Sequence, residues 1–411
     1  VPRAAFTWVT QKMKEELTIP LITSNRINMP ETAEKVLAEG HADMISMARP
    51  FLADPEWVNK AEAEKDDEIN TCIACNQACL DHAFQNKVAS CLVNPRACHE
   101  TELNYNPTEN KKKIAVVGAG PAGLAAATVA AQRGHQVTLF DADKETGGQF
   151  NIAKQIPGKE EFYETIRYFN KQIEIHNIDL KLNTRVSADD LANGDFDEVV
   201  LATGISPRTP RIQGVEHAKV LSYIDVVKHK KPVGKRVAVI GAGGIGFDVS
   251  EYLAHEGEST SQNIDAWLQE WGIDKSLEAR AGIEGVKAEI HPSPREIFMF
   301  KRSKGKFGAN LGKTTGWIHR SVLKRKKVQF INEVQYTKID DKGLHYTQNE
   351  EQKVLEVDNV ILCAGQLPFK ELLEPLEAKG VTTHVIGGAD FASELDAKRA
   401  IDQGSRLAAT L

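Results

Sequence analysis

The sequence is first informative through what it lacks. It has no run of eighteen or more apolar residues, so we expect no membrane-spanning helix. Its net charge is −6, which excludes a global basic field that would attract nucleic acid or an anionic membrane surface. It opens on VPRAAFTWVT, without a signal-peptide pattern and without an initiator Met. We therefore expect a cytoplasmic protein that binds neither membrane nor nucleic acid, and a chain that starts within a longer protein.

Cysteine is scarce, with six residues in 411, yet four of the six lie in one polar stretch. Their spacing is Cys72-x2-Cys75-x3-Cys79-x11-Cys91. Disulfides are disfavoured, because a cytoplasmic chain keeps its thiols reduced and the first three are too close together to pair. Structural zinc stays open, although zinc sites usually combine two knuckles and this stretch has one. Three thiolates in a compact loop and a distant fourth favour a 4Fe–4S cluster, whose irons each take one cysteine.

The two remaining cysteines are given other roles. Cys98 lies seven residues past Cys91 and beside His99; we interpret it as a bystander, although it keeps the zinc alternative open. Cys363 lies in the apolar run NVILCAG and is predicted to be a buried strand residue rather than a ligand.

Two short apolar segments, residues 19–22 and 42–47, are predicted to be buried strands. Between them, PETAEKVLAEG predicts a helix with Pro30 in its first turn and Gly40 as its stop. A strand, a helix and a second strand form a βαβ unit, which makes the two strands parallel.

A polar or basic pair comes after each of these strands: Asn25 and Arg26 after the first, Ala48 and Arg49 after the second. The loops after the last two strands of a (β/α)8 barrel commonly bind a phosphate, which suits arginine and backbone N–H groups. This phosphate site competes with a plainer interpretation, in which both arginines are solvated loop residues.

The segment KKIAVVGAGPAGLAAATVAAQRGHQVTLFDAD predicts a dinucleotide site. Its parts, in order, are a strand over 114–117, the glycines Gly118, Gly120 and Gly123, an alanine-rich helix, a strand over 137–140, and Asp141. The glycines let the backbone approach a pyrophosphate at the helix N-terminus. Asp141 can accept hydrogen bonds from a ribose diol.

The glycine pattern recurs in KRVAVIGAGGIGFDVSEYL. A strand over 237–240 leads into Gly241, Gly243 and Gly246. The next strand, over 296–300, ends in the basic run KRSK instead of an acid. Basic residues at this place favour the 2′-phosphate of NADPH. The alternative is a solvated surface patch.

Three further motifs accompany the first site: GGQF from Gly147, ATG from Ala202, and VIGGAD, which ends at Asp390. The pattern resembles flavoprotein reductases with two dinucleotide-binding domains. In those proteins an inserted NAD(P) domain splits the FAD domain, and the late Asp meets the ribityl chain of the flavin.

The whole assembly is similar to the NADPH-dependent 2,4-dienoyl-CoA reductase family of bacterial β-oxidation. The resemblance rests on ADMISMARPFLADP, on CIACNQAC…CLVNPRAC, and on the order of the two dinucleotide motifs. It covers essentially all of the chain. Trimethylamine dehydrogenase and 2-enoate reductases share the architecture. The narrower assignment rests on GESTSQNIDAWLQEWGID (257–274) and LGKTTGWIHR (311–320).

The resemblance implies an α/β protein that combines the end of an old-yellow-enzyme-like (β/α)8 barrel with two Rossmann-like domains. The implied domains are the last strands of the FMN-binding barrel (1–66), an iron–sulfur segment (67–110), a FAD domain (111–228 and 350–411) and an inserted NADPH domain (229–349).

The resemblance also implies a reaction, in which electrons pass from NADPH through FAD, a 4Fe–4S cluster and FMN to a 2,4-dienoyl-CoA. The implied cluster ligands are Cys72, Cys75, Cys79 and Cys91. The implied FMN residues are Asn25, Arg26, Ala48 and Arg49. The implied FAD residues are Gly118, Gly120, Ala122, Gly123, Asp141, Gly148, Gln149, Val186, Thr203, Gly204, Gly388 and Asp390. The implied NADPH residues are Gly241, Gly243, Gly246, Arg302 and Lys304.

One departure from that family is large. In the family, most of the barrel, including its Tyr and His proton-transfer residues, precedes the point where this chain starts. We therefore expect no residue for diene reduction here and expect the missing barrel to be required in cis or in trans. The alternatives are an NADH-linked 2-enoate reductase-type enzyme and a dedicated electron-transfer subunit that serves another protein.

Overall fold

The two glycine-rich turns belong to two different parallel sheets. The structure is a computed structural model that describes residues 1–393 and 396–411. These residues group into two units. Unit 1 contains Val1–Met47, Ile152–Glu160 and Pro207–Gly365, and unit 2 contains Ala48–Asn151, Glu161–Ser206 and Gln366–Leu411.

Unit 2 is built on a five-stranded parallel sheet whose strands are mostly apolar runs, as expected for strands covered on both faces. The strand order is β17 (Thr383–Val385), β6 (Glu198–Leu201), β3 (Lys113–Val117), β4 (Gln136–Phe140) and β5 (Asp179–Lys181). The strands predicted over 114–117 and 137–140 are β3 and β4, and each begins one residue earlier than predicted.

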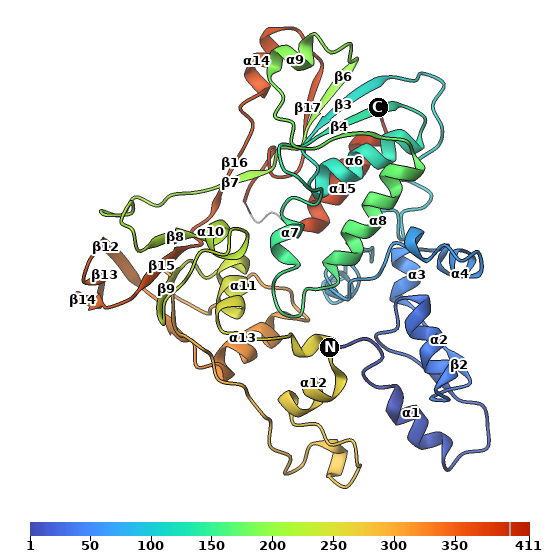
Figure 1. The fold of residues 1–411 in the computed structure, drawn as a ribbon, viewed down its shortest axis with the longest axis vertical. Helices are drawn as coiled ribbons and strands as arrows, with labels where there is room; N and C mark the ends of the chain where they lie inside the picture. Colours follow the sequence, from blue (N-terminus) through green and yellow to red (C-terminus); the bar gives the residue numbers. More distant parts are fainter. Residues whose placement is uncertain (394–395) are drawn as a thin grey trace. The chain divides into compact units, whose positions relative to one another are not determined.

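Three helices lie beside one another against this sheet (Figure 1): α6 (Pro121–Gln132), α8 (Phe162–Ile175) and α15 (Ala397–Ala408). The alanine-rich sequence of α6 lets α15 approach it closely. A Cβ atom at Gly404 would lie 2.3 Å from the carbonyl oxygen of Ala122, so α15 needs a glycine at that point. This packing buries nine residues of α6 and holds the helix start against the sheet.

The remaining elements of unit 2 are short, and residues 69–79 form no helix or strand. They are α3 (Arg49–Ala53), α4 (Trp57–Glu62), the 3-10 helix η1 (Asp66–Glu68), α5 (Leu80–Ala83), α9 (Ala188–Ala192), β16 (Gln366–Pro368) and α14 (Leu373–Ala378). Two more, α7 (Phe150–Ala153) and β7 (Ile205–Pro207), lie where the chain passes between the units.

Unit 1 contains a second five-stranded parallel sheet. Its order is β11 (Gln329–Ile331), β10 (Glu296–Phe300), β9 (Arg236–Ile240), β15 (Asn359–Leu362) and β8 (Val220–Ser222). The strands predicted over 237–240 and 296–300 are β9 and β10. The sheet extends beyond the range 229–349 on both sides, through β8 and β15. The assignment of whole domains to single cofactors stays a prediction.

An antiparallel sheet and several helices complete this part of unit 1. The strands are β12 (Val334–Asp340), β13 (Gly343–Gln348) and β14 (Glu351–Leu355). The helices are α10 (Tyr223–Val227), α11 (Gly244–Leu253), η2 (Thr260–Gln262), α12 (Ile264–Trp271), η3 (Arg280–Gly282) and α13 (Gly316–Arg325).

The start of unit 1 contains the predicted βαβ segment: α1 (Thr7–Lys14), β1 (Ile22–Thr23), α2 (Pro30–Ala38) and β2 (Met44–Ile45). The strands are parallel and the helix begins at Pro30, as predicted. The prediction that these strands are buried is wrong, since Ile19, Ile22 and Met44 are 58–64% exposed. In the described residues β1 and β2 pair only with each other, so no further strand covers their apolar side chains.

Candidate functional site

The first glycine turn allows no side chain at two positions. Gly118 has a φ of +109°, and a Cβ there would lie 2.4 Å from the carbonyl oxygen of Ala202. A Cβ at Gly123 would lie 1.8 Å from the carbonyl oxygen of Gly118. The N–H of Gly118 donates to the carbonyl of Phe140 at 2.8 Å, which fixes the turn between β3 and β4. The bare backbone at the start of α6 is therefore open to a phosphate group.

Asp141 closes this turn from the end of β4. One carboxylate oxygen accepts a hydrogen bond from the N–H of Ala119 at 2.6 Å, and the other accepts from the N–H of Asp143 at 2.7 Å. The side chain is thus held against the turn, and its contact with a ribose stays a prediction.

A second pair of glycines packs against the first turn. The N–H of Gly147 donates to the carbonyl of Ala119 at 2.8 Å. Gly148 has a φ of +51°, and its Cβ would lie 2.9 Å from the Cα of Gly120. The GGQF motif therefore brings half-buried Gln149 close to the turn, although Gln149 and Gly120 are 29 residues apart.

The other residues predicted at this site lie at the same end of the sheet or in its core. Thr203 donates a hydrogen bond to the carbonyl of Phe369, and Gly204 has a φ of +76°. Gly388 and Ala122 are buried, and half-buried Val186 packs against a cluster that includes Leu201.

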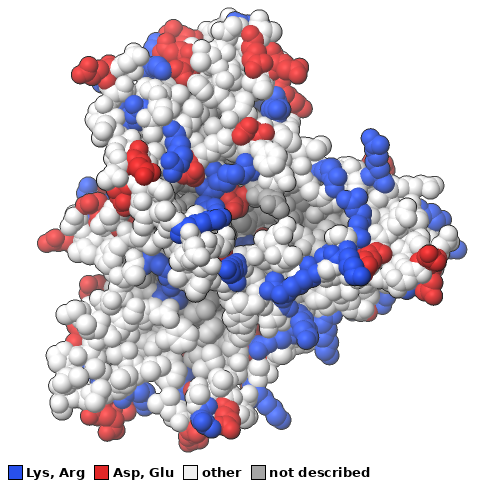
Figure 2. Space-filling view, turned by 180° about the vertical axis from the view of Figure 1, so that it is seen from behind, with Lys and Arg blue, Asp and Glu red and all other residues white. Residues whose placement is uncertain are grey.

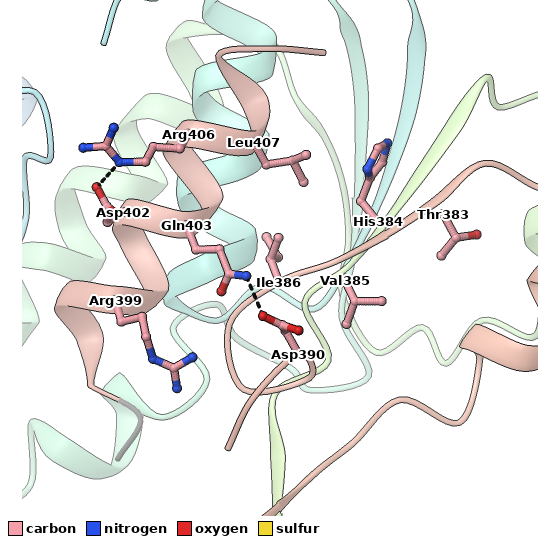
Figure 3. A pocket seen from close by; sticks show the side chains of 10 residues that line it. All are labelled: Thr383, His384, Val385, Ile386, Asp390, Arg399, Asp402, Gln403, Arg406 and Leu407. Carbon is pink, nitrogen blue, oxygen red and sulfur yellow. Dashed lines mark hydrogen bonds and ion pairs between the residues drawn. The ribbon is translucent and has the colours of Figure 1, made fainter. Parts of the chain in front are cut away.

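Asp390 lines a cavity of about 780 Å³ between β17 and α15 (Figure 3). Its carboxylate accepts a hydrogen bond from the amide nitrogen of Gln403 at 2.8 Å. The amide oxygen of Gln403 in turn accepts from the N–H of Gly387 at 2.8 Å. The cavity also holds two cations, Arg399 and Arg406, so it presents groups of both charges. The structure thus ties exposed Asp390 to α15.

The second glycine turn repeats the geometry of the first. Gly241 has a φ of +123°, and its Cβ would lie 2.2 Å from the carbonyl oxygen of Cys363. A Cβ at Gly246 would lie 1.9 Å from the carbonyl oxygen of Gly241. A Cβ at Gly243 would have no neighbour within 4 Å, whereas one at the equivalent Gly120 would lie 3.9 Å from the Cα of Gly148. The second turn is therefore open at the position where Gly148 covers the first. Cys363 is buried, as predicted, one residue past the end of β15.

A long acid-free segment comes after the second turn. No Asp or Glu occurs from Ile297 to Asn332, whereas ten Lys and Arg do. Arg302 and Lys304 lie directly after β10, are exposed, and form no ion pair with the residues that the structure describes. Figure 2 shows where Lys and Arg side chains of the whole chain come close together in one view, without distinguishing those of this segment. This local positive charge contrasts with the net charge of −6.

Two carboxylates on α11 form ion pairs that the sequence did not reveal. Asp248 lies two residues past Gly246 and pairs with Lys159 at 2.6 Å. Glu251 is buried and its Oε1 lies 2.7 Å from Nδ1 of His319 on α13. Burial acts to lower the pKa of His319, but the hydrogen bond and charge of Glu251 outweigh it and raise that pKa. The signal that could have indicated them is two acids, one at a half-buried and one at a buried position, in an otherwise largely apolar helix.

The four clustered cysteines come together in one loop of unit 2. Burial raises the pKa of the Cys75 thiol, and the charges of the three other thiols raise it further. Burial and the charges of Cys72 and Cys79 raise the pKa of Cys91 to about 12, although backbone N–H groups donate to its sulfur. Each of the other three clustered cysteines thus contributes to the raised pKa of Cys75, and two of them to that of Cys91. Cys98 is exposed and is not among the groups that shift these pKa values.

The backbone of this loop is bent around the thiols. Ala74 and Asn76, which flank Cys75, have φ values of +53° and +61°. Arg49 fixes the bend by donating to Oδ1 of Asn76 at 2.6 Å. Cys72, Cys75 and Cys91 pack against the core that contains α6, so the loop rests on the same unit as the first glycine turn.

Comparison with known proteins identifies the larger part of the chain. Residues 112–395 match the family described as pyridine nucleotide-disulphide oxidoreductase. The chain belongs to this family. Residues 1–68 match the NADH:flavin oxidoreductase / NADH oxidase family. Membership in the pyridine nucleotide-disulphide oxidoreductase family accounts for the two glycine turns, since flavin and pyridine nucleotide binding accompany it.

Several relatives match nearly the whole chain. A metal reductase of Desulforamulus reducens is 35% identical over 95% of the chain and 58% of its own length. An NADH oxidase of Thermoanaerobacter brockii is 33% identical over 93% of the chain and 54% of its own length. A cinnamate reductase of Clostridium sporogenes is 27% identical over 92% of the chain and 51% of its own length. The chain thus spans little more than half the length of these relatives.

The solved structure of a 2-naphthoyl-CoA reductase, in complex with 2-naphthoyl-CoA, has the same fold. It superposes with a TM-score of 0.86 and 28% identity, and the match covers 100% of this chain and 57% of the other. The fold is therefore a mixed α/β arrangement with parallel sheets, as the sequence predicted. No helix that could cross a membrane occurs among residues 1–393 and 396–411.

The cysteine loop is where the predicted 4Fe–4S cluster would be held. In the described parts of the chain, no three His, Cys, Asp or Glu side chains are arranged to hold one metal ion. A cubane takes one thiolate per iron, so its ligands need only surround a common space. Cys72, Cys75, Cys79 and Cys91 would supply four such thiolates from one loop, and the cluster stays a prediction.

The residues predicted at the FMN phosphate are divided between the units. Asn25 and Arg26 belong to unit 1, have φ values of +88° and +56°, and come after β1; Nε of Arg26 donates to the carbonyl of Val1. Ala48 and Arg49 belong to unit 2, where Arg49 binds Asn76. The predicted phosphate site stays a prediction.

Proposed function

We propose that this chain is the electron-input part of an NADPH-dependent flavoenzyme that reduces a conjugated C=C bond in an acyl-CoA, with a 2,4-dienoyl-CoA as the substrate. When bound, the nicotinamide supplies two electrons at once, a 4Fe–4S cluster carries one at a time, and FAD and FMN exchange either number. The observation that carries the proposal is the loop of Cys72, Cys75, Cys79 and Cys91 on the unit that holds the first glycine turn.

The first turn suits FAD. Its bare backbone faces a phosphate, Asp141 lies where a ribose would be bound, and Gly148 covers Gly120. These groups bind and orient a dinucleotide without donating or accepting protons in the reaction.

The second turn suits NADPH. Arg302 and Lys304 come directly after β10, which is the neighbour of the motif strand β9. A 2′-phosphate at the end of that strand would meet a guanidinium that can bind it through two hydrogen bonds. The plainer alternative, a solvated patch and an NADH-linked enzyme, is supported by the NADH oxidase among the relatives.

The substrate class is supported by the relatives. The solved 2-naphthoyl-CoA reductase binds a conjugated CoA thioester, and the cinnamate reductase is named for a conjugated acid. Residues 257–274 and 311–320, which favoured the dienoyl-CoA reductases, form η2, α12 and the start of α13 in unit 1.

The diene-reducing barrel is proposed to be supplied in cis or in trans. Ile22 and Met44 lie opposite each other in register across β1 and β2, and both are 58% exposed. Such a pair on a two-stranded sheet with open edges is a candidate contact for further strands. A second candidate function, an electron-transfer subunit for a separate barrel protein, is favoured by the same exposed pair.

The deciding experiment is metal and sulfide analysis of the anaerobically purified protein. We expect about four irons and four sulfides per chain. Cys75→Ser should abolish both, whereas Cys98→Ser, a matched change at the exposed cysteine, should leave them unchanged. Stoichiometric zinc without sulfide would overturn the proposal.

Flavin content gives an independent check. Acid-released cofactor should contain FAD, because the first turn is complete, and little or no FMN. FMN at parity with FAD would contradict the view that most of the FMN site lies outside this chain.

A further inference from the structure

One arginine of α8 reaches the backbone that leads into the cysteine loop. Arg167 Nη2 donates to the carbonyl of Ile69 at 2.7 Å and to Oγ1 of Thr71 at 3.0 Å. Its Nη1 donates to the carbonyl of Asp67. Its Nε is held by Glu164 on the same helix at 2.7 Å. A single guanidinium thus fixes the residues immediately before Cys72.

The same segment is also held by Asp54, whose Oδ2 accepts a hydrogen bond from the N–H of Asn70 at 2.8 Å. Residues 69–71 form no helix or strand, yet all three are buried. Asn70 connects them to the far end of the loop, because its Nδ2 donates to the carbonyl of Val93 at 2.9 Å, two residues past Cys91. Arg167 and Asn70 therefore connect α8 to both ends of the set of thiols.

The position of α8 makes this contact relevant to electron transfer. Ile166, Phe169 and Ile173 of α8 pack into the core that also contains α6, the helix of the first glycine turn. The guanidinium side chain of Arg167 is 28% exposed and never loses its charge. It forms an ion pair with Glu164 on the same helix at 2.7 Å and lies next to Thr71, the residue that precedes the first cysteine.

We propose that Arg167 is a positioning residue for the cluster that receives electrons from FAD, and that its charge stabilises the reduced cluster. The inference rests on the proposed function. The step is the transfer of one electron from reduced FAD to the oxidised cluster; no bond forms, and the cluster gains one negative charge. The positive guanidinium of Arg167, which is bonded to Thr71, favours the reduced cluster over the oxidised one. Its several hydrogen bonds hold the loop at a fixed distance from α8.

Lys171 provides a matched control. It lies one turn later on α8 and pairs with the carboxylate of Asp67 at 2.8 Å, and that side chain is 54% exposed. Lys171 therefore carries the same charge on the same helix as Arg167. It differs in its partner, because Lys171 binds the exposed carboxylate of Asp67 whereas Arg167 binds the buried residues 69–71.

The test compares Arg167→Met, Arg167→Lys and Lys171→Met with the parent, all purified anaerobically with their cofactors. Measurements are iron and sulfide content, the cluster potential from a dye-mediated titration followed by EPR, and the rate of cluster reduction after mixing with NADPH. For Arg167→Met we expect retained iron, slower cluster reduction, and a roughly tenfold less favourable reduction equilibrium, about 59 mV for one electron. Arg167→Lys should keep the potential but slow the transfer, and Lys171→Met should match the parent.

The outcomes separate the inference from the proposed function. A parent without iron would overturn the proposed function itself. Iron-loaded Arg167→Met with the parental potential and rate would overturn the role of Arg167 alone. If Arg167→Met does not retain iron, Arg167→Lys decides: slowed transfer at the parental potential supports the role, and the parental rate overturns it.

Discussion

The two glycine turns share one backbone geometry and differ in the residues that end the next strand. In both, the first glycine has a φ above +100° and faces a carbonyl of the neighbouring strand, and the last glycine faces the first. After the first turn, the next strand ends in Asp141, which binds back to the turn; after the second, it ends in the basic run from Lys301. The shared geometry suits any pyrophosphate, and the differing residues select the ribose. The charge at one strand end therefore separates the proposed FAD site from the proposed NADPH site.

The largest effect is expected from closing either turn. Gly246→Ala places a methyl group 1.9 Å from the carbonyl oxygen of Gly241, which only a backbone shift can relieve. We expect FAD to be retained and its reduction by NADPH to slow at least about hundredfold, the equivalent of nearly 3 kcal/mol. Gly123→Ala should instead yield protein without FAD. Flavin content and the rate of FAD reduction in a stopped-flow experiment are measured for both variants. Loss of FAD in Gly246→Ala, with FAD retained but slowly reduced in Gly123→Ala, would contradict the comparison.

The next effect concerns coenzyme choice. A hydrogen bond to a charged group contributes about 1.5–3 kcal/mol, which is roughly a 10- to 150-fold preference. We expect kcat/KM for ferricyanide reduction to be at least about tenfold higher with NADPH than with NADH. Arg302→Ala should remove most of that preference by weakening NADPH, and Lys324→Ala, a change to another cation of the same acid-free segment, should not. Equal use of both coenzymes by the parent would show that the basic run is only a solvated patch.

The mirror change at the first turn is expected to be milder. Asp141→Ala removes the acceptor for the N–H of Ala119 and the predicted ribose contact. The loss of one such hydrogen bond costs about 1 kcal/mol, so the affinity for FAD should fall about five- to tenfold. A fluorescence titration of FAD into protein from which the bound FAD has been removed measures this Kd. An unchanged Kd would remove Asp141 from the site.

The smallest effect is a pH dependence of stability in unit 1. Because Glu251 raises the pKa of His319 in the folded protein, the charged histidine contributes stability that is fully present below its ordinary pKa of 6.5, down to the pH at which Glu251, whose own pKa is raised by burial, becomes protonated. This stabilisation is lost as the pH rises through the raised value. We expect His319→Gln to lower Tm by about 2–4 °C at pH 6, as a loss of about 1 kcal/mol would, and to have less effect at pH 8.5. A difference between variant and parent that does not vary with pH would contradict this.

Local rules made much of the architecture predictable. The strands β3, β4, β9 and β10 and both turns result from apolar runs and from glycines that backbone contacts require. The cysteine spacing indicated one loop, and the structure brings the four thiols together.

Contacts between distant residues were not predictable. Arg167 meets Thr71 across 96 residues and Lys159 meets Asp248 across 89, and no pattern in either segment indicates its partner. The burial of β1 and β2 was predicted wrongly for a related reason. Apolar residues show what a strand would bury but not whether the covering strands are present.

The central claim, that electrons enter at the second turn and leave through the cysteine loop, is tested most directly by an anaerobic titration with NADPH. FAD is followed by its absorbance and the cluster by EPR. We expect FAD to bleach and the EPR signal of a reduced 4Fe–4S cluster to grow with it, and we expect Cys75→Ser to bleach without that signal. Bleaching of FAD in the parent with no cluster signal at any NADPH concentration would contradict the claim.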